Sequence, residues 1–240
     1  VDPCSPYLPA ARRPRRRPYG HGRFAAQILP KPPRLPFINR RWRRYGLPRE
    51  IAAELLPSLP RPDAVLVTSM MTYWCEGVAE TIALCKETWP DTPVILGGVY
   101  ATLCADHARQ HSGADHVLPG TLEANWPQLT ELVGLAGAPP PVEPWPAYHL
   151  APYVDSTGLL TSRGCPHRCA YCGVSQLQPH YLRYSPEAVE AQLHQIVDEL
   201  GIGNVALMDD AFLCDTERAL AILERIAALP KPPRLHAASG

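Results

Sequence analysis

The chain has 240 residues, of which 46% are hydrophobic and 19% charged, and this composition excludes a largely disordered protein. Lys+Arg and Asp+Glu number 23 each, so the net charge gives no general attraction to a polyanion. No apolar run approaches the ~20 residues of a membrane span, and the first residues contain no apolar signal core. We therefore expect a cytoplasmic protein, in which eight cysteines indicate metal binding or catalysis rather than disulfides.

Residues 1–62 form a basic, proline-rich segment that we expect to be extended. Residues 1–60 hold 13 of the 23 basic side chains. The arginine run at 12–17 is typical of a nucleic-acid patch, but it contains no aromatic residue, so an RNA-binding or RNA-modifying role ranks last. Apolar residues at 37–45 and an expected short helix at 47–56 indicate that the second half of the segment docks on the protein.

Residues 63–133 alternate short apolar strands with helices. Expected strands, buried on both faces, lie at 63–69 and 92–98, with a shorter one at 115–118; expected helices lie at 76–89, 101–111 and 122–133. This alternation indicates parallel βαβ units in a partial doubly wound, Rossmann-like α/β domain. Such sheets bind ligands at the carboxyl ends of their strands, here residues 69–72 and 97–100.

Residues 134–152 are dense in glycine and proline and are expected to be a linker. Residues 153–240 then form a second βα series. Its expected strands lie at 159–162, 204–208 and 234–238, and its expected helices at 185–200 and 215–229. Ser185 and Asp215 are the expected N-caps of the two helices. Arg163 and Arg183 are expected to form surface salt bridges, with binding of a carboxylate or a ribose as the alternative.

The most specific motif follows the first strand of this second series: Cys165, Cys169 and Cys172 share one short loop with Cys-x3-Cys-x2-Cys spacing. Three thiolates that bind a four-iron cubane leave one iron open to another ligand. Two alternatives remain. The three thiolates and one of His167, His180 or Cys214 would close a tetrahedral zinc site, or the three cysteines are unrelated buried residues.

The stretch Thr161–Cys172, with its cysteine spacing, preceding strand and aromatic residue before the third cysteine, resembles the radical S-adenosylmethionine (radical SAM) enzymes. The resemblance implies that Cys165, Cys169 and Cys172 bind a [4Fe–4S] cluster. It also implies that the cluster reductively cleaves S-adenosylmethionine to a 5′-deoxyadenosyl radical, which acts on a small-molecule substrate. A flavodoxin- or ferredoxin-type protein would supply the electron.

The same resemblance implies two contacts to S-adenosylmethionine. Tyr171 would lie beside the adenine, with ordinary packing as the alternative. Asp209 or Asp210, at the end of the next strand, would bind the cofactor's ammonium group, or both would be solvated turn residues. Many relatives carry Gly-Gly-Glu where this chain has the two aspartates.

Within residues 63–133, the stretches 67–74, 96–102, 112–115 and 119–123 resemble the cobalamin (B12)-binding domain of one radical SAM subgroup. The resemblance implies that cobalamin would lie against the strand ends, at Ser69, Met70, Gly97, Gly98 and Tyr100. The Asp-x-His-x-x-Gly loop whose histidine binds cobalt in other cobalamin proteins is absent, and Asp106-His107 lacks the spacing. A vestigial or regulatory Rossmann-like domain is the alternative.

These features predict a fold in which the partial Rossmann-like domain is followed by the first half of a radical SAM (β/α) partial barrel, in a fragment cut at both ends. The expected activity is radical SAM chemistry, with cobalamin-dependent methylation as one outcome and a ring or carbon-skeleton rearrangement as another. The alternative is that the protein is not an enzyme but a binding module stabilised by zinc or by an iron–sulfur cluster.

Overall fold

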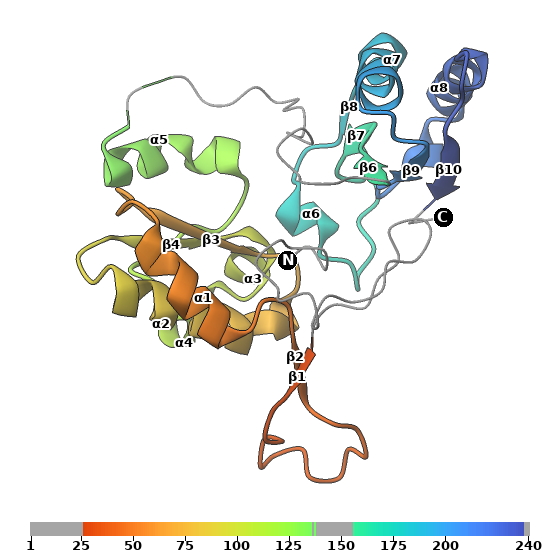
Figure 1. Ribbon diagram of the computed structural model, residues 1–240. Coiled ribbons are helices and arrows are strands. Elements are labelled where there is room, and N and C mark those ends of the chain that lie inside the picture. The colour runs from red at the N-terminus through yellow and green to blue at the C-terminus, as the bar shows by residue number, and fades with distance from the viewer. Residues whose placement is uncertain (1–25, 136, 138–155, 238–240) are drawn as a thin grey trace.

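The computed structural model describes residues 26–135, 137 and 156–237, and the arginine run and most of the expected linker lie outside this range. Figure 1 shows two α/β units, which we call the N-terminal half (residues 26–137) and the C-terminal half (residues 156–237). Each half is built on a three-stranded parallel sheet.

The N-terminal half begins with an antiparallel hairpin, and its main sheet has the order β3-β4-β5. Its strands are β1 (Ala26–Ile28), β2 (Arg43–Tyr45), β3 (Val65–Ser69), β4 (Val94–Gly97) and β5 (His116–Val117). Its helices are α1 (Arg49–Leu55), α2 (Cys75–Thr88), α3 (Gly98–Leu103), α4 (Ala105–His111) and α5 (Leu122–Val133). In Figure 1, α5 covers one face of the sheet, and α1, α2 and α4 lie on the other.

Burial differs between the two long strands of this sheet. Val94, Ile95 and Leu96 of β4 are fully buried, as expected for a central strand. β3 was expected to be buried on both faces, but Leu66 is 61% exposed. In the described residues β3 is an edge strand: Val65 and Val67 pack on the core beneath α2, and Leu66 faces a cavity.

Two expected elements of the N-terminal half take a different form. The helix expected at 101–111 is two helices, because the backbone of Cys104 (φ −131°, ψ 45°) leaves the helical region between α3 and α4. The expected extended chain before residue 46 contains the β1–β2 hairpin, which pairs Ala26 with Tyr45. Arg44 fastens the hairpin to α2 through a 2.9 Å ion pair with Glu80.

The C-terminal half has the strand order β10-β9-β6 and a short antiparallel ladder, β7–β8. Its strands are β6 (Thr157–Leu159), β7 (Ser162–Arg163), β8 (Leu182–Arg183), β9 (Asn204–Leu207) and β10 (Arg234–Ala237). Its α-helices are α6 (Val174–Leu177), α7 (Pro186–His194) and α8 (Thr216–Ala228), and α7 continues as a π-helical turn at Gln195–Glu199. α7 and α8 pack together over the sheet (Figure 1), and their apolar faces form one core with β6 and β9.

The capping predictions for this half are confirmed. The Ser185 side chain accepts a hydrogen bond from the Ala188 amide, with Pro186 in the first turn, and Asp215 accepts one from the Arg218 amide. The fold is thus mixed α/β with Rossmann-like parallel sheets, and the described residues show an open sheet rather than a barrel. Within the same residues, none of the helices has the length and apolarity to cross a membrane.

Candidate functional site

A cavity of about 950 Å³ separates the two halves, at the upper end of the range for small-molecule sites. From the N-terminal half, the ends of β3 and β4 and the loop at 118–123 line it. From the C-terminal half come the end of β6, the end of β9, α6 and part of α7. The carboxyl ends of both parallel sheets therefore border one space, which is where α/β proteins bind ligands.

The loop that carries the three cysteines has a closed base. β6 ends at Leu159, and the chain then forms the β7–β8 ladder, in which Ser162 pairs with Arg183. The Tyr184 amide donates to the Thr161 carbonyl over 3.0 Å, so the two ends of the 161–184 segment meet. We call residues 161–184 the cysteine loop. α6, within this loop, packs on α3 of the other half.

The three cysteines are free thiols: Cys165 is half-buried, and Cys169 and Cys172 are exposed. The Cys172 amide donates to the Cys169 carbonyl over 3.0 Å, which forms a tight turn between them. Within the described ranges, the structure gathers no group of three His, Cys, Asp or Glu side chains close enough for one metal ion. The His167 Nε2 atom lies 3.1 Å from the Cys214 Sγ atom.

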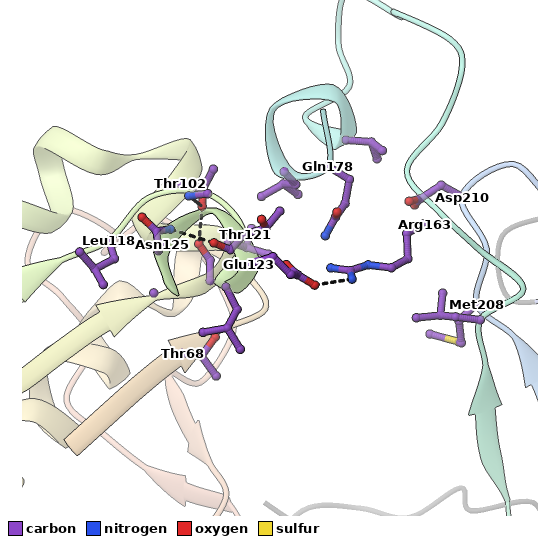
Figure 2. Close-up of a pocket in the computed structure, with 18 of the residues that line it drawn as sticks. Thr68, Thr102, Leu118, Thr121, Glu123, Asn125, Arg163, Gln178, Met208 and Asp210 are labelled. Carbon is purple, nitrogen blue, oxygen red and sulfur yellow. Dashed lines mark hydrogen bonds and ion pairs between the residues drawn. The ribbon is translucent and has the colours of Figure 1, made fainter. Parts of the chain in front are cut away.

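The two aspartates after β9 face different surroundings. Asp209 is 1% exposed, and its carboxylate accepts hydrogen bonds from the Thr161 amide (3.1 Å), the Thr161 hydroxyl (2.8 Å) and the Ser162 hydroxyl (2.5 Å). Asp210 lines the cavity instead, beside Met208 and Arg163 (Figure 2). Desolvation, reinforced by the charge of Asp209, raises the pKa of Asp210. Asp210 is therefore the aspartate available to a ligand.

Tyr171, expected beside the adenine, is 92% exposed and does not line the cavity. Of the residues expected to contact cobalamin, Gly97 and Gly98 line the cavity, and Ser69, Met70 and Tyr100 do not. The Tyr100 hydroxyl lies 2.7 Å from His107 Nδ1, and the Tyr100 side chain is 1% exposed. Burial raises the pKa of Tyr100.

Gly98 has a structural reason to be glycine. Its φ is +82°, and a Cβ atom there would lie 2.2 Å from the Thr68 Oγ1 atom and 3.0 Å from the Ser69 carbonyl. The close approach of β3 to the start of α3 thus requires this glycine whatever the cavity holds. Gly97 has only the Leu118 carbonyl within 4 Å of its Cβ position, at 3.9 Å, and this packing does not require a glycine.

Sequence reasoning gave no role to Glu123, which forms an ion pair between the two halves. Its Oε1 atom lies 2.6 Å from Arg163 Nη1, and Figure 2 shows the two side chains meeting across the cavity. This hydrogen bond lowers the pKa of Glu123. Both arginines form the expected salt bridges: Arg183 pairs with Asp215 at 2.6 Å on the surface, whereas the Arg163 pair is partly buried rather than on the surface.

Side chains of the N-terminal half hold the loop that presents Glu123. The Thr102 hydroxyl accepts from the Gly120 amide (2.9 Å) and donates to the Gly98 carbonyl (2.8 Å). The Asn125 amide group donates to the carbonyls of Pro119 (2.8 Å) and Thr121 (2.9 Å). The sequence alone predicted neither role, because both depend on partners brought close by the fold.

No protein-family model matches the chain. A protein named Uncharacterized methyltransferase PH0819, from Pyrococcus horikoshii, is a distant homologue, 28% identical over 200 residues. The alignment covers 69% of this chain and 43% of that protein, so the chain spans less than half the length of the relative.

Proposed function

We propose that this chain is part of a radical SAM enzyme that binds a [4Fe–4S] cluster through Cys165, Cys169 and Cys172, and that its reaction is a methyl transfer. The observation that carries the proposal is the placement of three free thiols on one loop at the carboxyl edge of a parallel sheet. The distant homologue that is named a methyltransferase supports the same reaction class.

The donor set fits an iron–sulfur cluster. Three thiolates and no carboxylate come from one short loop, and soft sulfur ligands favour iron–sulfur clusters over hard cations. Bound there, the cluster would supply the electron that cleaves S-adenosylmethionine. The exposure of Cys169 and Cys172 leaves this side of the loop accessible to a flavodoxin- or ferredoxin-type electron donor.

Asp210 is the residue best placed to receive the cofactor's ammonium group. Its carboxylate borders the cavity, and its raised pKa reflects an environment that disfavours an uncompensated negative charge. A cation bound beside it would compensate that charge and lower the pKa again. Asp209 has its carboxylate occupied by Thr161 and Ser162, so we assign it no contact with the cofactor.

We place the substrate in the cavity. If the reaction depends on cobalamin, the corrin ring would lie there too. Its walls are largely apolar, with Leu66, Leu118 and Met208 among them. Gly97 leaves the end of β4 open to a flat ligand. A Rossmann-like half that binds no cobalamin stays the alternative, and spectral titration with methylcobalamin separates the two.

The test is anaerobic reconstitution of the full 240-residue chain with iron and sulfide, followed by electron paramagnetic resonance (EPR) spectroscopy of the reduced protein. We expect about four irons per chain and an EPR signal that changes shape when S-adenosylmethionine is added. Release of 5′-deoxyadenosine and methionine, detected by mass spectrometry, would show cleavage.

Two cysteine variants make the test specific. Cys169→Ala is expected to abolish the cluster signal, whereas Cys214→Ala, which removes another exposed thiol outside the motif, is expected to keep it. If the protein instead holds stoichiometric zinc that is lost in Cys214→Ala, the zinc-stabilised binding module replaces our proposal.

A further inference from the structure

We infer that Asp209 is a positioning residue that fixes the start of the cysteine loop, an assignment that rests on the proposed cluster site. Its buried carboxylate lies beneath the point where the chain leaves β6 and enters the loop. Both oxygens are used: Oδ2 accepts from the Thr161 amide, and Oδ1 accepts from the hydroxyls of Thr161 and Ser162. A buried carboxylate with three donors is a strong local restraint.

The restraint acts at short range on the first cluster ligand. Cys165 follows Ser162 by only three residues. Between them, Gly164 turns the chain at φ +79°, so tightly that a Cβ atom would lie 2.7 Å from the His180 carbonyl. Because the chain at Gly164 is packed this tightly, we expect a displacement of the Thr161 or Ser162 backbone to displace the Cys165 sulfur as well.

Arg218 restrains the same point from a second element. Its Nε atom donates to the Tyr184 carbonyl over 2.9 Å, and its Nη2 atom donates to the Thr161 carbonyl. Arg218, from α8, therefore contacts both ends of the cysteine loop, at Thr161 and at Tyr184. Asp209, which follows β9, contacts only the Thr161 end. The loop base is fixed by residues that follow it in the sequence by 25 positions or more.

The chemistry predicts a graded series of variants. Asp209→Asn removes the charge and replaces one acceptor oxygen by an NH2 group, so the remaining oxygen can accept from the Thr161 amide or from the two hydroxyls, but not from both sides. Thr161→Val and Ser162→Ala each remove one hydroxyl donor and keep the carboxylate. We expect Asp209→Asn to be the most severe of the three.

The experiment measures iron release from the reconstituted chain to a ferrous chelator, the EPR response to S-adenosylmethionine, and amide hydrogen exchange across residues 161–184. In Asp209→Asn we expect iron release about tenfold faster or more, a lost or altered EPR response, and faster exchange in the loop. The two hydroxyl variants should fall between it and the wild type.

Asp115→Asn is the control for the same chemical change at a more exposed carboxylate. Asp115 is also a carboxylate that accepts from a backbone amide, that of Val94 (2.8 Å), and from a side chain, Lys86 (2.5 Å), but it lies in the N-terminal half. It should leave iron release and the EPR response at wild-type values. Equal effects of the two Asp→Asn changes would mean general destabilisation and would overturn the assignment.

The failures are distinguishable. A wild-type chain that takes up no cluster overturns the proposed function, and this assignment with it. A wild-type cluster with unchanged release in Asp209→Asn overturns the assignment alone. If circular dichroism shows that Asp209→Asn does not fold, Thr161→Val and Ser162→Ala test the assignment instead. Iron release at the wild-type rate in both of these variants would then overturn it.

Discussion

Arg163 Nη1 lies 2.6 Å from Glu123 Oε1, and this ion pair joins the two halves across the cavity. Only 18% of the Arg163 side chain and 26% of the Glu123 side chain are exposed, so solvent screens the pair less than it screens a surface pair. Arg163 belongs to β7, within the cysteine loop, and Glu123 to the first turn of α5. The pair therefore ties the cysteine loop to the Rossmann-like half.

Glu123→Gln is expected to lower the free energy of unfolding at neutral pH by about 1–2 kcal/mol. The Arg163 hydrogen bond holds the pKa of Glu123 below its ordinary value of 4.5. The stabilisation is thus fully present above that value and is lost as the pH falls through the lower pKa of the folded protein. Urea unfolding of both proteins at a series of pH values should show their difference shrinking in acid.

Asp106→Asn is the control for that prediction, because the Asp106–Arg109 pair has side chains 90% and 53% exposed and should contribute little. A Glu123→Gln effect that stays constant into acid would contradict the assigned cause.

Gly98→Ala is expected to destabilise the N-terminal half by about 2–4 kcal/mol. The alanine would have to adopt φ +82° and place its Cβ atom 2.2 Å from the Thr68 Oγ1 atom. Thermal unfolding of Gly98→Ala and Gly77→Ala compares the two sites. Gly77 lies inside α2 with nothing within 4 Å of its Cβ position, so alanine there should stabilise by up to about 1 kcal/mol.

Gly164→Ala is expected to lower the iron content of the reconstituted chain more than its melting temperature. The new methyl group would meet the His180 carbonyl, and the cysteine loop can relieve the clash by moving away from its β8 side. Gly201→Ala is the control. Gly201 also has a positive φ (+66°), but nothing lies within 4 Å of its Cβ position, so this variant shows the effect of backbone strain without a clash. Equal iron content in the two variants would refute the role of Gly164.

Asp210→Asn is expected to weaken S-adenosylmethionine binding by about tenfold, because the ammonium group loses its charged acceptor. The same change should leave the protein as stable as the wild type or slightly more stable at neutral pH. The pKa of Asp210 is raised in the folded state, so its ionised form opposes folding above that pKa. Isothermal titration and thermal melts measure the two effects separately, and a joint loss of stability and affinity would argue against the assignment.

The sequence predicted the features that depend on residues close together in the chain, such as the starts of helices. Ser185 and Asp215 begin helices because a side-chain oxygen can accept from an amide three residues later, and this pattern is visible without a fold. The break at Cys104 carries no glycine or proline signal, and the expected single helix at 101–111 was therefore wrong.

The two aspartates show where sequence reasoning ends at the site. The sequence places Asp209 and Asp210 just after an expected strand, where both could equally have been solvated turn residues, and it does not show which of them faces the interior. Which one does so depends on Thr161 and Ser162, which lie 47 or more positions away. The Glu123–Arg163 pair, 40 positions apart, is equally invisible before the two halves come together.

The closed base of the cysteine loop has a consequence for how a cluster enters. When the Tyr184 amide meets the Thr161 carbonyl, the entropy of closing this long excursion is already lost on folding of the polypeptide. Uptake of the proposed cluster would then have to order only the eight residues from Cys165 to Cys172, whatever the length of chain around them. If the proposed cluster binds there, the base of the loop would already be in place and only the segment that holds the three cysteines would still have to close around the metal, so cluster insertion would follow folding rather than start it.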